Sequence, residues 1–211
     1  MRTTIASDDW IKIIELICDI LENEKGYLSD LDGAIGDGDH GVNMAKCFRE
    51  VRKKLPDSVG KDPGTVLKNV GLVVMNSVGG AMGALYGTLF LKMAKEAAGR
   101  NEIDLETLVR MFSAAESGIQ EMGKAKLGDK TLLDTLHPAV EALKEARDKG
   151  KTLTEALTDF SEAAKQGAES TKEMISKIGR SSRLGERTRG HQDAGATSCY
   201  LILSAFRRAV T

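Results

Sequence analysis

The chain has 211 residues, of which 41% are hydrophobic and 29% are charged. This composition predicts a soluble globular protein with one large domain, or at most two small ones, and a sizeable core. Thirty basic and 31 acidic residues give a formal net charge of -1. The overall charge therefore gives no reason to expect binding to nucleic acid or to an anionic membrane, and any preference for phosphate must be local.

The cysteines and the N-terminus bear on the compartment. Cys18, Cys47 and Cys199 are odd in number and scattered within apolar helical patterns, which is typical of reduced core thiols in a cytosolic protein. Residues Met1–Thr4 lead directly into an amphipathic pattern, so no signal or transit peptide is expected. The sequence thus predicts a cytoplasmic location.

The first predicted helix follows Ser7, which is placed to cap it, and ends at Gly26. Apolar residues at helical spacing form its buried face: Trp10, Ile13, Ile14, Ile17, Ile20 and Leu21.

Residues 32–43 then read Asp-Gly-Ala-Ile-Gly-Asp-Gly-Asp-His-Gly-Val-Asn, with three aspartates and four glycines. The glycines let the backbone bend sharply, so the carboxylates of Asp32, Asp37 and Asp39 can point to one place. Converging carboxylates repel one another and favour a bound cation, and hard oxygen ligands favour magnesium. A calcium loop or a plain acidic turn is the alternative, although the spacing lacks the regular oxygen ladder of an EF-hand.

A helix is predicted to start near His40 or Gly41, because apolar residues recur after it at three- and four-residue steps: Val42, Ala45, Phe48, Val51 and Leu55. Its free amides would face the aspartates, and a helix start binds anions. Carboxylates for a metal beside free amides indicate a nucleotide phosphate site, although the spacing of a P-loop is missing.

Asp62-Pro63 signals the start of the next helix, which is expected to end near Ser77. The uncharged stretch Val70–Leu91 is long enough to cross a bilayer, but five glycines dilute it and Gly79-Gly80 breaks it. Two buried helices are therefore predicted. The second glycine-rich helix start, Gly79–Gly83, suits phosphate binding and close helix packing equally well.

Asp104 is expected to cap a helix that leads into Gly123–Thr131. This segment resembles a Walker A sequence, but Asp129 interrupts the spacing and no strand precedes it. Pro138, with His137 beside it, is expected to start another helix. The capping box Thr152 to Glu155 is expected to start a long helix that continues through Ile178.

The segment Gly179–Gly195 carries four arginines and almost no apolar residue. Arginines in a glycine-rich loop suit phosphate, whereas the alternative is a solvated loop or a rim of ion pairs. No more than one or two of the four are expected to touch a nucleotide. Asp193-Ala194-Gly195 is expected to start the terminal helix. Because no period-two alternation is sustained, the chain is predicted to be all-α.

Four stretches occur in order and together resemble the nucleotide-binding L subunits of dihydroxyacetone kinases: residues 31–43, Ser77–Ala81, Gly128–Thr131 and residues 184–193. The resemblance covers essentially the whole chain and implies a single ADP- and magnesium-binding domain over residues 1–211. It also implies an eight-helix antiparallel barrel with the nucleotide at one end.

In this family ADP is held through two Mg²⁺ ions, and the resemblance implies that Asp32, Asp37 and Asp39 bind them. The implied nucleotide contacts are His40, Gly41, Val42, Asn43, Ala81, Met82, Gly123, Leu132, Arg180, Asp193, Ala194 and Gly195. Relatives usually carry serine or threonine at the position of Met82, so a hydroxyl contact to phosphate is lost there unless a backbone amide replaces it.

A free-standing chain of this length resembles the phosphotransferase-system form, which depends on phosphoenolpyruvate (PEP). In that form a phosphohistidine M subunit phosphorylates the bound ADP, and the phosphoryl group passes to dihydroxyacetone held by a histidine of the K subunit. No catalytic residue is therefore expected in this chain. The alternatives are a kinase subunit that uses free ATP or another short ketose, and a signalling subunit that binds a transcription regulator.

Overall fold

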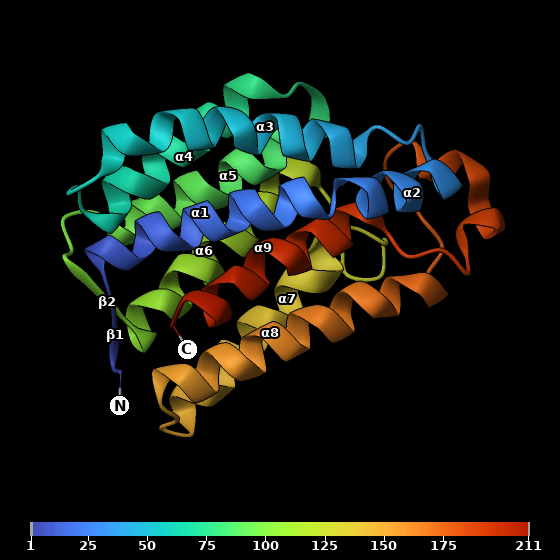
Figure 1. The fold of residues 1–211 in the computed structure, drawn as a ribbon. Helices are drawn as coiled ribbons and strands as arrows, with labels where there is room; N and C mark the ends of the chain where they lie inside the picture. The colour runs from blue at the N-terminus through green and yellow to red at the C-terminus, as the bar shows by residue number, and fades with distance from the viewer. Residues whose placement is uncertain (1, 211) are drawn as a thin grey trace.

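The computed structural model describes residues 2–210. The two ends of the expected domain, Met1 and Thr211, lie outside the described residues. Nine α-helices and two short strands account for most of the described chain (Figure 1). The elements with their bounds are β1 Thr4–Ala6, α1 Ser7–Asn23, α2 Lys25–Ile35, α3 His40–Lys54, α4 Pro63–Ser77, α5 Gly80–Ala97, β2 Glu102–Asp104, α6 Leu105–Gly123, α7 Leu133–Asp148, α8 Leu153–Ser170 and α9 Ala194–Val210. Three short 3-10 helices connect them: η1 Leu55–Ser58, η2 Thr171–Glu173 and η3 Ser181–Thr188.

The helices form a closed ring. α1 packs on α3, each of α3 to α8 packs on the next helix, and α9 returns to α1. Only Glu24 separates α1 from α2, so counting these two as one broken helix gives the eight helices of the expected barrel. Neighbouring helices run in opposite directions (Figure 1). The all-α prediction is therefore confirmed.

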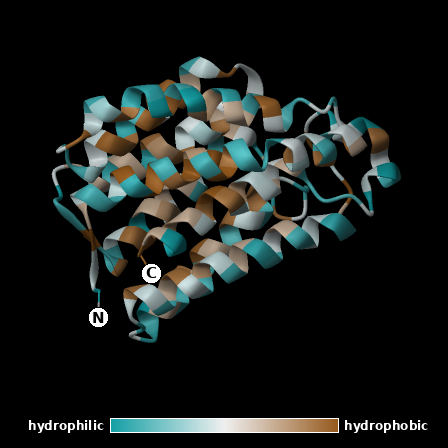
Figure 2. Ribbon diagram, viewed as in Figure 1, coloured by the Kyte–Doolittle hydropathy of each residue, from teal (hydrophilic) through white to brown (hydrophobic). Residues whose placement is uncertain are grey.

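Apolar faces turned inward explain the ring. Hydrophobic residues gather between the helices and polar residues cover the outer faces (Figure 2). Four buried aromatic rings meet inside the barrel, with Phe206 in edge contact with Trp10 at 5.7 Å and with Phe112 at 5.2 Å between ring centroids, and Phe160 4.7 Å from Phe112. Cys18, Cys47 and Cys199 are free and buried, as predicted.

The segment Val70–Leu91 forms the end of α4 and most of α5, as predicted. The two helices pack closely because both carry glycines at the contact. A side chain on Gly71 would meet Leu91 at 2.8 Å, and one on Gly87 would meet Met75 at 3.0 Å. Within residues 2–210, no helix combines the length and the apolar character that a bilayer crossing requires.

Several predicted helix boundaries are wrong. The N-cap of α1 is Ala6, whose N–H donates to the Asp9 carboxylate at 3.0 Å, while the Ser7 hydroxyl donates to the Asn101 carbonyl. Gly26 lies inside α2 and Pro138 lies inside α7 rather than at its start.

The end of the chain also differs from the prediction. α8 begins with the predicted capping box but ends at Ser170, so Ile178 lies beyond it. The strands were not predicted either: β1 pairs antiparallel with β2, with Ile5 opposite Ile103. Three residues a strand are too few to produce a visible alternation.

Antiparallel order places alternate connections at the same end of the barrel. One end, at the right of Figure 1, carries α2 and the connections 78–79, 124–132 and 171–193. The other end carries both termini and the strand pair (Figure 1). Every predicted site residue belongs to the first of these ends.

Candidate nucleotide and metal site

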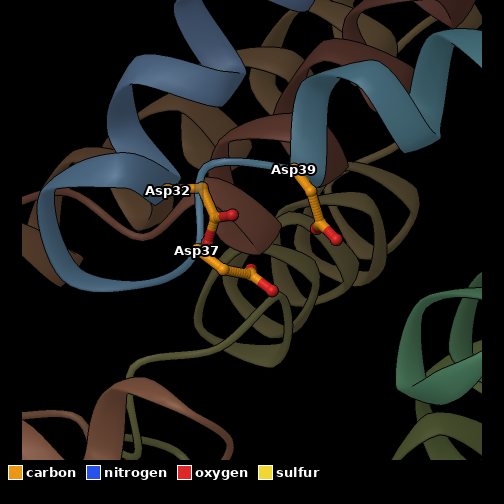
Figure 3. Close-up of side chains that lie close together, drawn as sticks. All are labelled: Asp32, Asp37 and Asp39. Atoms are coloured by element: carbon orange, nitrogen blue, oxygen red, sulfur yellow. The ribbon is translucent and has the colours of Figure 1, made fainter.

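Three carboxylates converge at the start of α3. Asp32 lies in the last turn of α2, and Asp37 and Asp39 lie in the turn that leads into α3. One oxygen from each of the three lies within 4.8 Å of the others. Figure 3 shows the side chains turned toward a common region, with Asp37 below the other two. The structure therefore brings together the residues predicted to bind metal.

Glycines make this convergence possible. A Cβ on Gly36 would lie 2.4 Å from a carboxylate oxygen of Asp32, and Gly38 has the positive φ of +75° that favours glycine. A Cβ on Gly41 would lie 1.9 Å from the Lys25 carbonyl oxygen. Gly41 therefore lets the first turn of α3 rest directly on the backbone of α2, which brings Asp32 beside the α3 start.

The donor set suits magnesium. Carboxylate oxygens are hard ligands, and a small number of them leaves coordination positions for water and phosphate, as Mg²⁺ requires. The backbone supports the same arrangement, since the His40 N–H donates to Oδ2 of Asp32 at 3.2 Å. Asp37 and Asp39 are exposed and Asp32 is half-buried, so a phosphate group can reach the ion from solvent.

The His40 ring is fixed from the barrel interior. Its Nε2 lies 2.8 Å from the Ser198 hydroxyl, which lies 2.6 Å from the Tyr86 hydroxyl. Tyr86 also donates to the Gly195 carbonyl at 3.0 Å. Burial lowers the pKa of His40, against the opposing charges of Asp32 and Asp39, so the ring is neutral at neutral pH.

Arg180 reaches the aspartates from the connection between α8 and α9. Its guanidinium forms an ion pair with Asp37, while Arg189 pairs with Glu186 at 3.3 Å and donates to the Glu173 carbonyl. Arg180 is therefore the one of the four arginines that forms an ion pair with a predicted metal ligand in the described residues. The nucleotide contact predicted for Arg180 stays a prediction.

Asp193 caps the start of α9. Its Oδ2 accepts from the Ala196 N–H at 2.7 Å, and its own N–H donates to the Thr171 hydroxyl at 3.0 Å. Burial raises the pKa of Asp193 to about 6, and the charge of Asp32 adds to the increase while that of Lys130 opposes it. The Asp193-Ala194-Gly195 turn thus starts the terminal helix, as predicted, at the same end as the aspartates.

The remaining predicted contacts line the same end. Gly41, Val42 and Asn43 lie in the first turn of α3, Ala81 and Met82 in that of α5, Gly123 ends α6, and Leu132 directly precedes α7. Val42 is 58% exposed, so its assignment to the apolar core face is wrong, although its place at the α3 start suits a ligand surface. That these residues touch a nucleotide stays a prediction.

Sequence reasoning missed the residues that support this end from inside. Lys130 and Asp134 are buried in the connection before α7 and at its start, and Ser198 and Tyr86 are buried behind His40. The Asp129-Lys130-Thr131 run was the only visible signal for the first pair. Ser198 and Tyr86 lie in apolar helical patterns and give no signal of their own.

Comparison with known proteins shows the family of this chain. The model of the DAK2 domain matches residues 34–208. The chain belongs to the DAK2 family. It is 43% identical over 185 residues to the "PEP-dependent dihydroxyacetone kinase, ADP-binding subunit DhaL" of Escherichia coli K12, covering 88% of each chain. It is 41% identical to the corresponding subunit of dihydroxyacetone kinase 2 from Listeria innocua, over 88% of this chain and 86% of the relative.

The DAK2 fold is also seen in a solved structure. The dihydroxyacetone kinase of C. freundii in its native form superposes with a TM-score of 0.74 at 25% identity, and the match covers 99% of this chain and 35% of that one. The two bacterial relatives are thus named as kinase subunits, and they match this DAK2 protein along most of their length.

Proposed function

We propose that the chain is the ADP-binding subunit of a PEP-dependent dihydroxyacetone kinase and acts in the cytoplasm as a single domain. The observation that carries this proposal is the convergence of Asp32, Asp37 and Asp39 beside the exposed start of α3. A helix start with free amides next to metal-binding carboxylates suits a metal-bound polyphosphate. The bacterial ADP-binding relatives support the same assignment.

In this proposal Asp32, Asp37 and Asp39 hold two magnesium ions. Bound there, the ions neutralise phosphate charge and hold the donor and the acceptor in line, which is most of what phosphoryl transfer asks of a protein. The first-turn amides of α3 and α5 and the start of α9 hold the nucleotide. Arg180, which is paired with Asp37, lies beside these carboxylates and is placed to meet a phosphate.

The chain holds ADP between two partners. A phosphohistidine of the M subunit donates its phosphoryl group to ADP, with the P–N bond breaking as a P–O bond forms. A hydroxyl of dihydroxyacetone, bound on the K subunit, then attacks the γ-phosphorus and gives up its proton to solvent. The bond between the γ-phosphorus and the β–γ bridging oxygen breaks, and the ADP that results stays bound to this chain. No nucleophile is needed in the chain, and His40 is a site residue whose ring Ser198 keeps in place.

Native mass spectrometry of the purified protein, before and after incubation with excess ATP, tests the proposal. Bound ADP with two magnesium ions that resists exchange is the expected result. An empty site would contradict it. A freely exchanging nucleotide would favour the second candidate function, a kinase subunit that uses free ATP for dihydroxyacetone or another short ketose. Capture of a transcription regulator by the purified chain would add the signalling role.

A further inference from the structure

Lys130 is a buried ammonium group that the proposed mechanism does not use. The residue is 1% exposed, and its Nζ donates to three backbone carbonyls: Met174 at 3.2 Å, Thr188 at 2.6 Å and His191 at 2.5 Å. A charge removed from water persists only where its hydrogen bonds are made. The three carbonyls therefore form a specific hydrogen-bonding site for this ammonium group.

All three carbonyls belong to one segment, residues 174–191, here called the arginine loop. Met174 opens the loop, and Thr188 and His191 close it, so one side chain joins its two ends. The Ser176 N–H donates to the Thr188 hydroxyl at 2.9 Å and strengthens the same closure. Lys130 thus fixes the base of the arginine loop to the connection between α6 and α7.

The arginine loop delivers Arg180 to the metal site. The helix η3 within it packs on α2, and the Arg180 guanidinium pairs with Asp37. Because the Arg180 side chain is 72% exposed, little packing holds it, and its position depends on where the base of the loop lies.

The backbone conformation at Lys130 directs its side chain toward the protein interior. Lys130 has a φ of +64°, a left-handed conformation that an L residue adopts at an energetic penalty. The buried Asp134 carboxylate holds the turn by accepting from the Gly128 N–H at 2.6 Å and the Thr131 N–H at 2.7 Å. Such backbone strain persists where the surrounding structure demands the conformation, often at functional sites.

We propose that Lys130 is a positioning residue of the nucleotide site: its ammonium group fastens the arginine loop so that Arg180 faces the Asp32, Asp37 and Asp39 cluster. The inference rests on the proposed function for its link to ADP, and on geometry alone for its link to the loop. The two links are tested separately.

Limited trypsin digestion tests the loop without any nucleotide. Lys130→Met keeps the length of the side chain and removes the charge, while Lys126→Met, an exposed lysine of the same connection, is the matched control. Lys130→Met should be cut at least tenfold faster after Arg180, Arg183, Arg187 or Arg189, with an unchanged circular dichroism spectrum. Each variant lacks its own trypsin site, so only cuts in the arginine loop are compared.

Calorimetry of Mg·ADP binding tests the positioning role in wild type, Lys130→Met, Arg180→Ala and the double variant. Lys130→Met should weaken binding at least tenfold in the wild-type background and hardly at all in the Arg180→Ala background, because Lys130 acts through Arg180. Equal weakening in both backgrounds would overturn the inference. A wild type that binds no Mg·ADP would instead contradict the proposed function and leave the trypsin result to decide the loop.

Lys130→Gln keeps a hydrogen-bond donor and serves as a milder variant in case Lys130→Met does not fold. Trypsin should cleave its arginine loop at a rate between those for wild type and Lys130→Met. If both Lys130 variants lose their helical signal as a whole, Lys130 serves general stability and the positioning role is wrong.

Discussion

Two glycine-rich helix starts lie at the same end of the barrel and differ in charge and in packing. The α3 start carries Asp37 and Asp39 and sits so close to α2 that a Cβ on Gly41 would lie 1.9 Å from the Lys25 carbonyl. At the α5 start, a Cβ on Gly79 or Gly80 would meet nothing within 4 Å. The first start is acidic and closely packed, and the second is uncharged and open.

The difference shows that one composition serves two physical purposes. At α3 the glycines permit a close approach that gathers carboxylates for a cation. At α5 the open amides suit an anion, while Gly83 and Gly87 further along pack closely, with Cβ positions 1.9 Å from the Val78 carbonyl oxygen and 3.0 Å from Met75. Of the two interpretations left open for this stretch, close packing therefore holds for Gly83 and Gly87, and phosphate binding at Gly79 and Gly80 stays a prediction.

Removing one charge from the acidic start should have the largest effect. Asp37→Asn replaces a carboxylate ligand by a neutral amide, so phosphoryl transfer, measured with the K and M subunits, should fall by about a thousandfold or more. The circular dichroism spectrum should stay helical. Asp30→Asn, at an exposed aspartate two residues before Asp32, is the control. An unchanged rate in Asp37→Asn would remove the basis for the metal assignment.

Adding one methyl group to each start tests the packing difference. Gly41→Ala should lower the free energy of unfolding in urea by about 3 kcal/mol, because its Cβ meets backbone that cannot move aside cheaply. Gly79→Ala, in open space, should change it by no more than about 0.5 kcal/mol. Equal losses in the two variants would contradict the comparison.

Asp193, at the start of α9, makes the stability of the fold depend on pH. The pKa of Asp193 is raised to about 6 in the folded protein, above its usual value of 3.8, so folding favours the protonated form. The charged form therefore destabilises the fold above pH 6, and this effect disappears as the pH falls through 6 toward about 4.

Asp193→Asn is neutral at every pH and therefore isolates the effect of Asp193 ionisation on stability. The stability of the variant relative to wild type should rise by on the order of 2 kcal/mol between about pH 4 and pH 7 and then stay constant. Thermal unfolding followed by circular dichroism measures it. A relative stability that does not change with pH would show that Asp193 is not desolvated.

The smallest expected effect concerns the open start. Met82→Ser adds a hydroxyl in the first turn of α5, so Mg·ADP affinity measured by calorimetry should rise about fivefold, the contribution of one net hydrogen bond. The loss of Met82, which packs against the core, should lower stability by about 1 kcal/mol. Met122→Ser, at an exposed methionine of the same end, should leave the affinity unchanged.

Most helix starts were predictable because caps act over three or four residues. The Asp62 and Asp104 carboxylates each accept from an N–H three residues ahead, and Thr152 and Glu155 form the predicted capping box. Pro138 misled the prediction because a proline is also tolerated inside a helix when tertiary packing holds the backbone. A side chain on Gly167 of α8 would lie 2.4 Å from the Asp134 carbonyl and 2.9 Å from Pro138.

The sequence by itself determined the helical class, most of the helix starts and the aspartate cluster, whose members lie within eight residues of one another and depend on local turns. Only the tertiary structure decided which buried side chains support the residues around that cluster. His40 meets Ser198 across 158 residues of chain, and Lys130 meets the arginine loop 44 to 61 residues away. Such contacts form because closing the helical ring places alternate connections together, and no local pattern records which buried groups will then meet.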